Sequence, residues 1–409
     1  MRFSTLRIAW RNLGRNRKRT ALAVLAVAVG QFGLLASQGV MRGYLGNIRR
    51  AITGPMVGHA QVHAPEWRDE RAMDLYVDDL DETLGAIRAQ DAVESAAARV
   101  YAPVLAAPER EAFVATVVGV NVEVESGDYG LLAGLEEPLR PGHVLVGYRL
   151  ARKMDVQPGD EVAVIGQAAD GSFATGLYDV QQIIKCPADL VNQSGIVMPL
   201  EQSQQLFMLQ NRAHEIVVRA RPGMKAGALA QGLRGAPALE GLEVKSWQEL
   251  MPELTMIIEM ADYVGYFVII LIFIAAVAGI ANTLMMATFE RMHEFGMLLA
   301  LGSRPLRLVR LIVVEAALLG FVGVVVGTVL GGAFVGITSY TGIDMASWGG
   351  EQVEDLAFMG LNLPLDIHPW IELFDVALGF VSVMITSLIA AAWPATVAAR
   401  LEPMEAMRA

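Results

Sequence analysis

Four apolar stretches of this 409-residue chain are each long enough to cross a lipid bilayer, which takes about 20 such residues. They lie at residues 21–40, 263–287, 307–338 and 371–394. A polar block, residues 41–262, separates the first stretch from the second and is large enough to bury a core of its own. We therefore expect an α-helical membrane protein with four transmembrane helices. A large extracytoplasmic α+β domain is expected as an insertion between the first helix and the second.

Composition narrows the class of protein. Hydrophobic residues make up 54% of the chain and charged residues 18%, which argues against disorder and against a purely soluble enzyme. The net charge of −11 argues against a nucleic-acid partner bound through bulk positive charge. The single cysteine, Cys186, excludes an internal disulfide and a multi-cysteine metal site, and is expected to be a small buried hydrophobe.

Motifs of known enzymes are missing from the sequence. There is no Gly-Lys-Ser/Thr, so there is no P-loop, and there is no Gly-x-Ser-x-Gly elbow. His214-Glu215 and His293-Glu294 lack the second histidine of a zinc-protease motif, because Val218 and Met297 stand there. We expect no catalytic residue, no metal site and no cofactor bound by this chain.

Basic residues predict the orientation in the membrane. Seven lysines and arginines precede the first span, and the loop 288–306 carries Arg291 and Arg304, whereas the segment 339–370 has none. Both termini and the loop 288–306 are therefore expected in the cytoplasm, and the block 41–262 and the segment 339–370 on the opposite side. The C-terminal tail is expected at 395–409.

The first 20 residues allow two interpretations. Basic and apolar residues followed by small residues near Ala36 fit a cleaved signal peptide. Against this, Phe3, Leu6, Trp10 and Leu13 repeat at helical spacing opposite arginines. That pattern favours an amphipathic cytoplasmic helix on the inner membrane surface.

The polar block shows alternating patterns typical of strands, with shorter helical segments between them. Pro158-Gly159-Asp160 predicts a turn into a strand. Strands are expected within 111–120, 156–165, 177–185, 214–220 and 242–247, strands running into helices at 143–154 and 195–209, and a helix at 225–234. Two lobes are expected within 41–262.

Two polar or small-residue features stand out within the spans. Glu315 is an intramembrane carboxylate, which is either functional or simply paired with a nearby polar group. Gly320, Gly323, Gly327 and Gly331 have the spacing that lets helix backbones approach closely. The approach is either to other spans of the same chain or to a second chain, and the spacing does not separate the two.

A short amphipathic helix is predicted in the loop between the second and third spans. Met292, Phe295 and Leu299 fall on one face, Gly302 is placed to cap the end, and Pro305 to open the next helix. Nothing obvious in the chain covers that apolar face. It therefore suits either a groove on a partner or the lipid interface.

Several motifs resemble those of FtsX/MacB-type ABC transporter permeases, over the whole chain and in order. These are ERMHEFGMLLALGS (290–303), LRIAWRNLGRNRKRTAL (6–22) and AAAWPATVAARLEPMEAMR (390–408). VQPGDEV, the YDV strand and GIVMPLEQSQQLF are similar to the outer domain of the lipoprotein-releasing permeases LolC and LolE. The loop 166–176 departs from that pattern, because it is short and lacks proline where a hook that recruits a carrier is expected.

The resemblance implies a mechanotransmission permease of the inner membrane that pairs with a second permease chain, as a homodimer or a heterodimer. ATP and Mg would be bound by a separate ABC ATPase subunit. A coupling helix would seat in that ATPase, and by position it comprises Glu290, Arg291, Glu294, Phe295, Gly296, Leu299, Ala300 and Gly302.

The resemblance also implies a substrate class and further partners. The substrate would be a lipoprotein or lipid taken from the membrane, with a periplasmic carrier or adaptor as a further partner. MacB-like export of small amphipathic molecules or peptides, and FtsX-like signalling to a cell-wall hydrolase, are the alternatives.

Overall fold

The computed structural model describes residues 2–15, 17–133, 135, 137–344, 357–358, 361–362 and 366–400. The chain divides into two compact units. The helical unit comprises Met1–Leu45, Ile258–Met345 and Asp366–Ala409, and the β-rich unit comprises Gly46–Ile257 and Ala346–Leu365. Trp348, Glu351, Glu354 and Asp355 of the expected segment 339–370, and the end of the tail at 401–409, lie outside the described residues.

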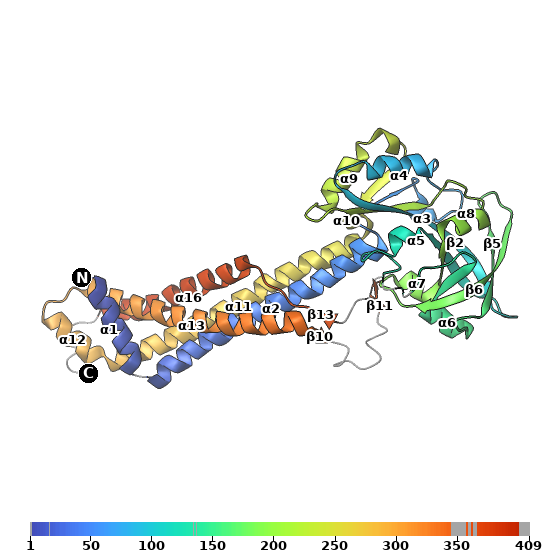
Figure 1. The fold of residues 1–409 in the computed structure, drawn as a ribbon. Coiled ribbons are helices and arrows are strands. Elements are labelled where there is room, and N and C mark those ends of the chain that lie inside the picture. Colours follow the sequence, from blue (N-terminus) through green and yellow to red (C-terminus); the bar gives the residue numbers. More distant parts are fainter. Residues whose placement is uncertain are drawn as a thin grey trace. The chain divides into compact units, whose positions relative to one another are not determined.

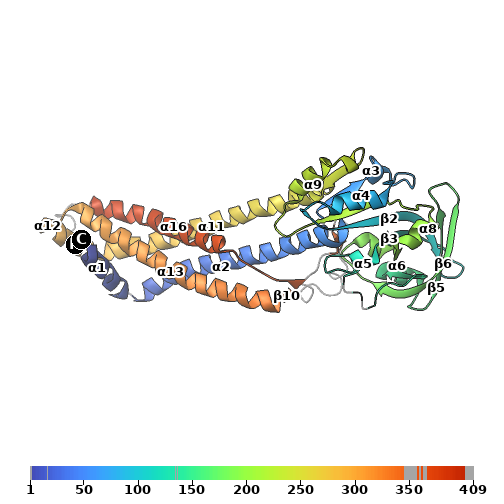
Figure 2. The same cartoon turned by 45° about the horizontal axis from the view of Figure 1, so that its top comes forward.

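The helical unit is built on four helices that are long and apolar enough to span a membrane, as predicted. Figures 1 and 2 show them running alongside one another. The first three of these helices extend beyond the expected apolar stretches at both ends, and the fourth extends beyond its stretch only at the C-terminal end. They are α2 (Arg17–Ala51), α11 (Pro252–Glu290), α13 (Pro305–Thr341) and α16 (Leu373–Ala399). The shorter elements are α1 (Arg2–Arg15), α12 (Met292–Ala300), β10 (Ile343–Asp344) and β13 (Asp366–Ile367).

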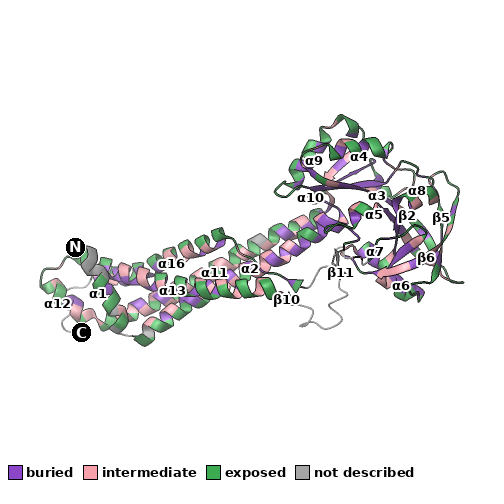
Figure 3. Ribbon diagram, in the orientation of Figure 1, coloured by how far each residue is buried: buried purple, intermediate pink, exposed green. Residues whose placement is uncertain are grey.

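Apolar side chains from all four long helices meet in one cluster. Val27 of α2, Leu284 of α11, Leu319 of α13 and Ala391 of α16 belong to it, and each is at most 2% exposed. Along α11, by contrast, side chains such as Phe267 remain largely exposed. Figure 3 shows much of this helix in the colours of exposed and intermediate residues. The chain therefore covers α13 well and leaves most of α11 uncovered.

Polar contacts also connect the helices of this unit. The Gln31 amide nitrogen on α2 donates to Thr328 Oγ1 on α13 at 3.2 Å. Nearer the other end of α2, the Arg42 guanidinium pairs with Asp375 (2.7 Å) and Glu372 (3.1 Å) at the start of α16. Carboxylates in the first turn of a helix are favoured by the helix dipole, and here they also bind α2.

The β-rich unit contains one nine-stranded sheet in the order β3-β7-β4-β6-β5-β2-β8-β1-β9. Because β2 also pairs with β3, the six strands from β3 through β2 close into a ring, and β2, β8, β1 and β9 continue as an antiparallel sheet. The strands are β1 (Ala60–His63), β2 (Val93–Ala107), β3 (Phe113–Val120), β4 (His143–Gly147), β5 (Glu161–Gln167), β6 (Phe173–Ile184), β7 (Gly195–Pro199), β8 (Glu215–Ala220) and β9 (Glu243–Ser246).

Short helices complete the β-rich unit. In α4 and α9, apolar side chains such as Ile87 and Leu233 pack against one face of the antiparallel part of the sheet, with Val62 and Val218. The single π-helical turn η1 directly continues α2. The helices are η1 (Ile52–Met56), α3 (Trp67–Glu70), α4 (Leu80–Arg88), α5 (Val122–Glu125), α6 (Tyr148–Met154), α7 (Asp189–Ser194), α8 (Leu200–Leu206), α9 (Ala226–Arg234), η2 (Pro237–Leu239) and α10 (Trp247–Leu250); the short pair β11 (Ala357–Phe358) and β12 (Leu361–Asn362) belongs to this unit as well.

The strands and helices predicted in the polar block are present. β3, β5, β6, β8, β9 and α9 fall within or overlap the expected segments, and β4–α6 and β7–α8 are strands followed by helices. Gly159 has a φ of +96°, as the predicted turn at Pro158-Gly159-Asp160 requires. β1 and the 15-residue β2 were not predicted; the run of alanines in β2 lacks the usual strand residues.

Candidate functional site

The short helix α12 has the ends that its sequence predicts. The Gly302 N–H donates to Leu299 O and the Ser303 N–H to Leu298 O, which is the Schellman pattern, and Gly302 has a φ of +84°. Pro305 then opens α13 at its first turn. The loop between α11 and α13 is therefore a tightly defined helix–turn–helix.

The apolar face of α12 is covered by the chain itself, so the expectation that nothing would cover it is wrong. Phe295 is 2% exposed and packs in a cluster with residues of three other helices, and Gly296 is buried too. Leu299 packs against the same cluster. The other members of the cluster are Ala9 of α1, Leu308, Leu311 and Ile312 of α13, and Ala395 and Ala398 of α16. The sequence did not show this because the covering residues are far away along the chain.

A different surface of this loop is exposed. Leu301 is 84% exposed, and Phe289, Met297 and Leu298 are each at least 41% exposed. Of the residues expected to contact an ATPase, Glu290, Ala300 and Gly302 are exposed, Arg291, Glu294 and Leu299 are partly buried, and Phe295 and Gly296 are buried. Binding of a partner by α12 stays a prediction, and the surface available for it centres on Leu301.

Arg291 connects α12 to α13. Its Nη1 lies 3.3 Å from Glu315 Oε2, its Nε 3.5 Å from Glu294 Oε2, and its guanidinium carbon 5.3 Å from the centre of the Phe295 ring. Of the two interpretations of Glu315, the structure therefore shows the pairing with a nearby polar group. The pair attaches α12 to the helix that follows it.

The four glycines of α13 pack against other helices of the same chain. A Cβ at Gly320 would meet Ser387 Oγ of α16 at 2.0 Å, and one at Gly327 would meet Ala28 O of α2 at 2.5 Å. Gly323 and Gly331 face Val27 and Leu35 of α2. Of the two partners that the spacing allows, these glycines thus contact the chain's own helices.

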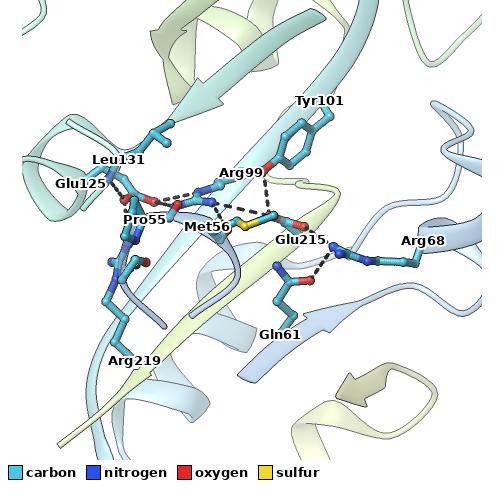
Figure 4. A network of polar contacts seen from close by, with 11 residues as sticks. Pro55, Met56, Gln61, Arg68, Arg99, Tyr101, Glu125, Leu131, Glu215 and Arg219 are labelled. Carbon is cyan, nitrogen blue, oxygen red and sulfur yellow. Dashed lines mark hydrogen bonds and ion pairs between the residues drawn. The ribbon is translucent and has the colours of Figure 1, made fainter. Parts of the chain in front are cut away.

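At the point where α2 and η1 end, two buried arginines bind the last carbonyl oxygens (Figure 4). Arg99 of β2 donates to Pro55 O and Met56 O, each at 2.7 Å. Arg219 of β8 donates from Nε to Gly54 O at 3.1 Å. A helix leaves its last carbonyl groups without partners, and cations are favoured there. We call Arg99, Arg219 and the carboxylate between them, Glu125, the arginine clamp.

Glu125 joins the two arginines of the clamp. Its Oε1 accepts from Arg99 Nε at 2.8 Å, and its Oε2 accepts from Arg219 Nη2 at 2.7 Å and from the Leu131 N–H at 2.8 Å. Burial alone would raise the pKa of Glu125, but the two arginines and the Leu131 N–H outweigh burial and lower it. Burial also disfavours the charged form of Arg99, and Glu125 outweighs it, so the pKa of Arg99 is raised. Burial lowers the pKa of Arg219, and the charge of Glu125 opposes that effect.

Strand alternation explains how the clamp is assembled. Arg99 pairs across the sheet with Glu215, and Glu215 pairs with His63 on β1. Neighbours along each strand face the other side of the sheet, where α4 and α9 cover them. These residues were not predicted from the sequence. The available signal was HEIVVRA (214–220), in which Glu215 and Arg219 stand four residues apart, on the same face of a strand that is buried throughout.

An aromatic stack lies beside the clamp. The Trp67 ring stacks on His214 at 5.8 Å between centroids, with 5° between the planes, and contacts Tyr101 at 5.7 Å. The Arg71 guanidinium lies 4.3 Å from the Trp67 centroid. Tyr101 donates its hydroxyl hydrogen to Glu215 Oε1 at 2.9 Å, which ties the stack to the same buried network.

The hairpin at residues 166–176 is as short as its sequence indicates. Ala168–Ser172 form the turn between β5 and β6, and β6 begins at Phe173. Next to this hairpin the outer face of the ring carries an exposed apolar row, in which Val114, Leu105 and Ile165 are direct cross-strand neighbours. Phe173 (92% exposed) and Leu177 (61%) lie on the same face.

No metal centre is assembled by the part of the chain that the structure describes. No group of three or more His, Cys, Asp or Glu side chains is placed there to hold an ion. Cys186 is buried, as expected, and burial raises the pKa of its thiol to about 11.

Family models match both parts of the chain. The MacB-like periplasmic core domain matches residues 20–236, which is more than half of the chain, and the FtsX-like permease C-terminal model matches residues 266–403. The chain belongs to the FtsX/MacB family of ABC transporter permeases. This confirms the family that its motifs resemble.

Similar proteins agree with this assignment. The lipoprotein-releasing system transmembrane protein LolC of Neisseria meningitidis is 24% identical over 300 residues, covering 70% of this chain and 69% of LolC. LolE of Haemophilus influenzae is 23% identical over 308 residues, covering 72% of each protein. The macrolide export ATP-binding/permease protein MacB 2 of Aeromonas hydrophila is 20% identical over 432 residues, covering 98% of this chain and 60% of MacB 2.

Proposed function

We propose that this FtsX/MacB-family permease works by mechanotransmission and extracts or releases lipoproteins or lipids from the inner membrane. A separate ABC ATPase subunit binds ATP and Mg and contacts the loop that contains α12. The β-rich unit lies in the periplasm, and both termini lie in the cytoplasm. The similarity to LolC and LolE supports the substrate class.

The observation that carries this proposal is the arginine clamp. The helix α2 is continuous from Arg17 to Ala51, and η1 continues it to Met56, where Arg99 and Arg219 bind its end. A movement of α2 along its axis would pull on buried, ionised side chains of β2 and β8. The β-rich unit would then move as a body, because β2 and β8 pair with each other at its centre.

A second permease chain is part of the proposal. The glycines of α13 are occupied by the chain's own helices, whereas Phe267, Ile270 and Ile274 of α11 are at least 54% exposed. We place the contact with the second permease chain on α11, with membrane lipid covering the remaining apolar surface.

The similarity to MacB supports a second candidate function, export of small amphipathic molecules or peptides together with an adaptor protein. In either case a periplasmic partner, a carrier or an adaptor, has an apolar surface available at Val114, Leu105, Ile165, Phe173 and Leu177. Signalling to a cell-wall hydrolase, as in FtsX, is the remaining alternative.

Purification of the full chain from membranes at native expression, followed by mass spectrometry, tests the proposal. A co-purifying P-loop ATPase is expected. A co-purifying carrier, adaptor or hydrolase would decide between lipoprotein release, export with an adaptor and signalling to a hydrolase. If the chain purifies alone, and stays alone when the candidate ATPase is added, the transporter proposal is contradicted.

A pair of variants tests the surface of α12. Leu301→Lys places a charge on the most exposed apolar residue of this loop and is expected to abolish ATPase binding without loss of membrane insertion. Tyr340→Lys is the matched control, because Tyr340 is 91% exposed near the opposite end of α13. Pull-down of the ATPase measures the difference. Equal binding by wild type and Leu301→Lys would remove α12 from the contact.

A further inference from the structure

A cavity of about 90 Å³ lies beside the arginine clamp, entirely within the β-rich unit. Its walls come from the end of η1 and from β1, β2, α3, α7 and β8. Two lining residues, Arg71 and Leu190, are exposed, which gives the cavity access from solvent. The polar and charged lining residues are Gln61, Arg68, Arg71, Arg99, Tyr101, Asp189 and Glu215.

Gln61 offers a buried donor without an acceptor. The residue is 1% exposed, and among the described residues its amide nitrogen has no hydrogen-bond partner. Its amide oxygen accepts from Arg68 Nη1 at 3.1 Å, and an arginine can only donate, so the orientation of the amide is determined. A buried donor left unsatisfied is unfavourable, which indicates that an acceptor from outside the described chain completes the site.

Arg71 offers a second set of donors. Its guanidinium carbon lies 4.3 Å from the centre of the Trp67 ring, a cation–π contact that holds the side chain beside the cavity. Among the described residues no carboxylate lies within 4.0 Å of it. Arg71 and Glu66 both have positive φ, 53° and 67°, and flank the four-residue helix α3. This strained backbone sets the position of the Arg71 side chain.

Charge around the cavity is unbalanced. The lining residues include three arginines, Arg68, Arg71 and Arg99, and two carboxylates, Asp189 and Glu215, so one positive charge is uncompensated. Asp189 is already paired with Arg149 at 3.0 Å, and Glu215 lies 3.8 Å from Arg99 and 3.9 Å from Arg68. The lining arginine left without a carboxylate is therefore Arg71.

We propose that this cavity is a binding site for one phosphate-type oxyanion, held by Arg68, Arg71 and the Gln61 amide nitrogen. The anion supplies the negative charge that Arg71 lacks, and the volume accommodates one such group with bound water. The phosphate is either free or the headgroup of a lipid, since the chemistry of recognition is the same. The site adjoins Pro55 and Met56 through Arg99, so its occupation would stiffen the end of η1.

The test uses the full chain in detergent, labelled with 5-fluorotryptophan, and follows the ¹⁹F resonance of Trp67, assigned with Trp67→Phe. Inorganic phosphate and a short-chain phosphatidic acid are titrated separately at constant ionic strength. At least one probe is expected to shift the Trp67 resonance saturably. Arg71→Gln and Gln61→Glu should each weaken the binding of that probe about tenfold or more, because each removes a group that donates a hydrogen bond to the anion.

Arg212→Gln is the matched control, because Arg212 also lies over an aromatic ring, that of Tyr76 at 4.4 Å, but outside the cavity. It should bind like wild type. A response to inorganic phosphate assigns a free anion, and a response to phosphatidic acid alone assigns a lipid headgroup. The proposal is overturned if neither probe shifts Trp67, or if Arg71→Gln and Gln61→Glu bind like wild type. These results are independent of whether an ATPase co-purifies.

Discussion

His214 is held neutral by the two hydrogen bonds of its ring. The Tyr101 N–H donates to Nδ1 at 2.9 Å, and Nε2 lies 3.3 Å from Met73 O, so Nδ1 is the acceptor and Nε2 the donor. Burial lowers the pKa of His214 to about 4. A second proton on Nδ1 would face an N–H group, with no acceptor to receive it.

This residue makes stability depend on pH. The folded pKa of about 4 lies below the ordinary value of 6.5, so the unfolded chain binds the proton more tightly. Above about pH 6.5 neutral His214 does not reduce the free energy of unfolding. As the pH decreases from 6.5 toward 4, that free energy falls by about 3 kcal/mol in total. Chemical unfolding of the full chain at pH 7 and pH 5, followed by Trp fluorescence, measures it. His214→Gln should flatten the dependence; an unchanged slope would assign it to other groups.

Cys186 should be chemically inert in the folded chain. It is 7% exposed and its thiol pKa is raised to about 11, so little thiolate forms near neutral pH. Alkylation by iodoacetamide at pH 7.5 is expected to be at least about a hundredfold slower in the native protein than in urea. Mass spectrometry of timed samples measures both rates. Comparable rates would mean that the segment around Cys186 opens readily.

At the scale of elements, the arginine clamp attaches the end of one helix to a sheet. η1 contributes three carbonyl oxygens, and β2 and β8 contribute the cations that bind them. The pairing of Arg99 with Glu215 across β2 and β8 holds the cations in register. Neither the helix nor the strands show this contact in their own sequence patterns.

Removing the charge of Glu125 should weaken the clamp. Glu125→Gln removes the carboxylate that pairs with Arg219 and leaves buried Arg99 only the more distant Glu215, at 3.8 Å. The free energy of unfolding is expected to fall by about 3 kcal/mol or more. Glu123→Gln, an exposed position on the same helix α5, is the control and should change it little. Urea unfolding of the three chains compares them. Equal midpoints for all three would mean that Glu125 does not hold the arginines together.

At the scale of the whole molecule, a variant in the clamp and a variant in α12 are expected to lose different activities. A milder clamp variant, Arg219→Lys, keeps the positive charge at this position. It loses the planar guanidinium, which contacts both Gly54 O and Glu125. Such a chain is expected to retain ATPase binding and to lose most substrate release, whereas Leu301→Lys loses ATPase binding itself. Pull-down and release assays on both variants separate these outcomes. Release at the wild-type rate by Arg219→Lys would contradict transmission through the clamp.

The proposed pairing of two permease chains predicts a specific cross-link. In a Cys186→Ser background, Ile274→Cys on α11 should form an intermolecular disulfide in membranes, because that side chain is 58% exposed in the single chain. Val329→Cys on α13 is 65% exposed and serves as the control, which should remain monomeric. Non-reducing electrophoresis measures the difference. Cross-linking only at residue 329 would place the contact on α13 instead.

Much of the fold could be predicted because local pattern suffices for it. Long apolar stretches can only be helices in a membrane, and alternation with turns marks β3 to β9. Gly302 and Pro305 mark helix ends through backbone conformation alone. The motif 290–303 sufficed to recognise the family, which the family models confirm.

The sequence alone thus determined what depends on neighbours along the chain: the spans, most strands, the caps and the family. Only the tertiary structure decided what depends on residues far apart. It turned Phe295 inward against Ala9, Leu308 and Ala398, and it placed the glycines of α13 against α2 and α16. It also brought Arg99, Glu125 and Arg219 to the end of η1. The physical reason is that burial and charge pairing act through space, so no local pattern records them.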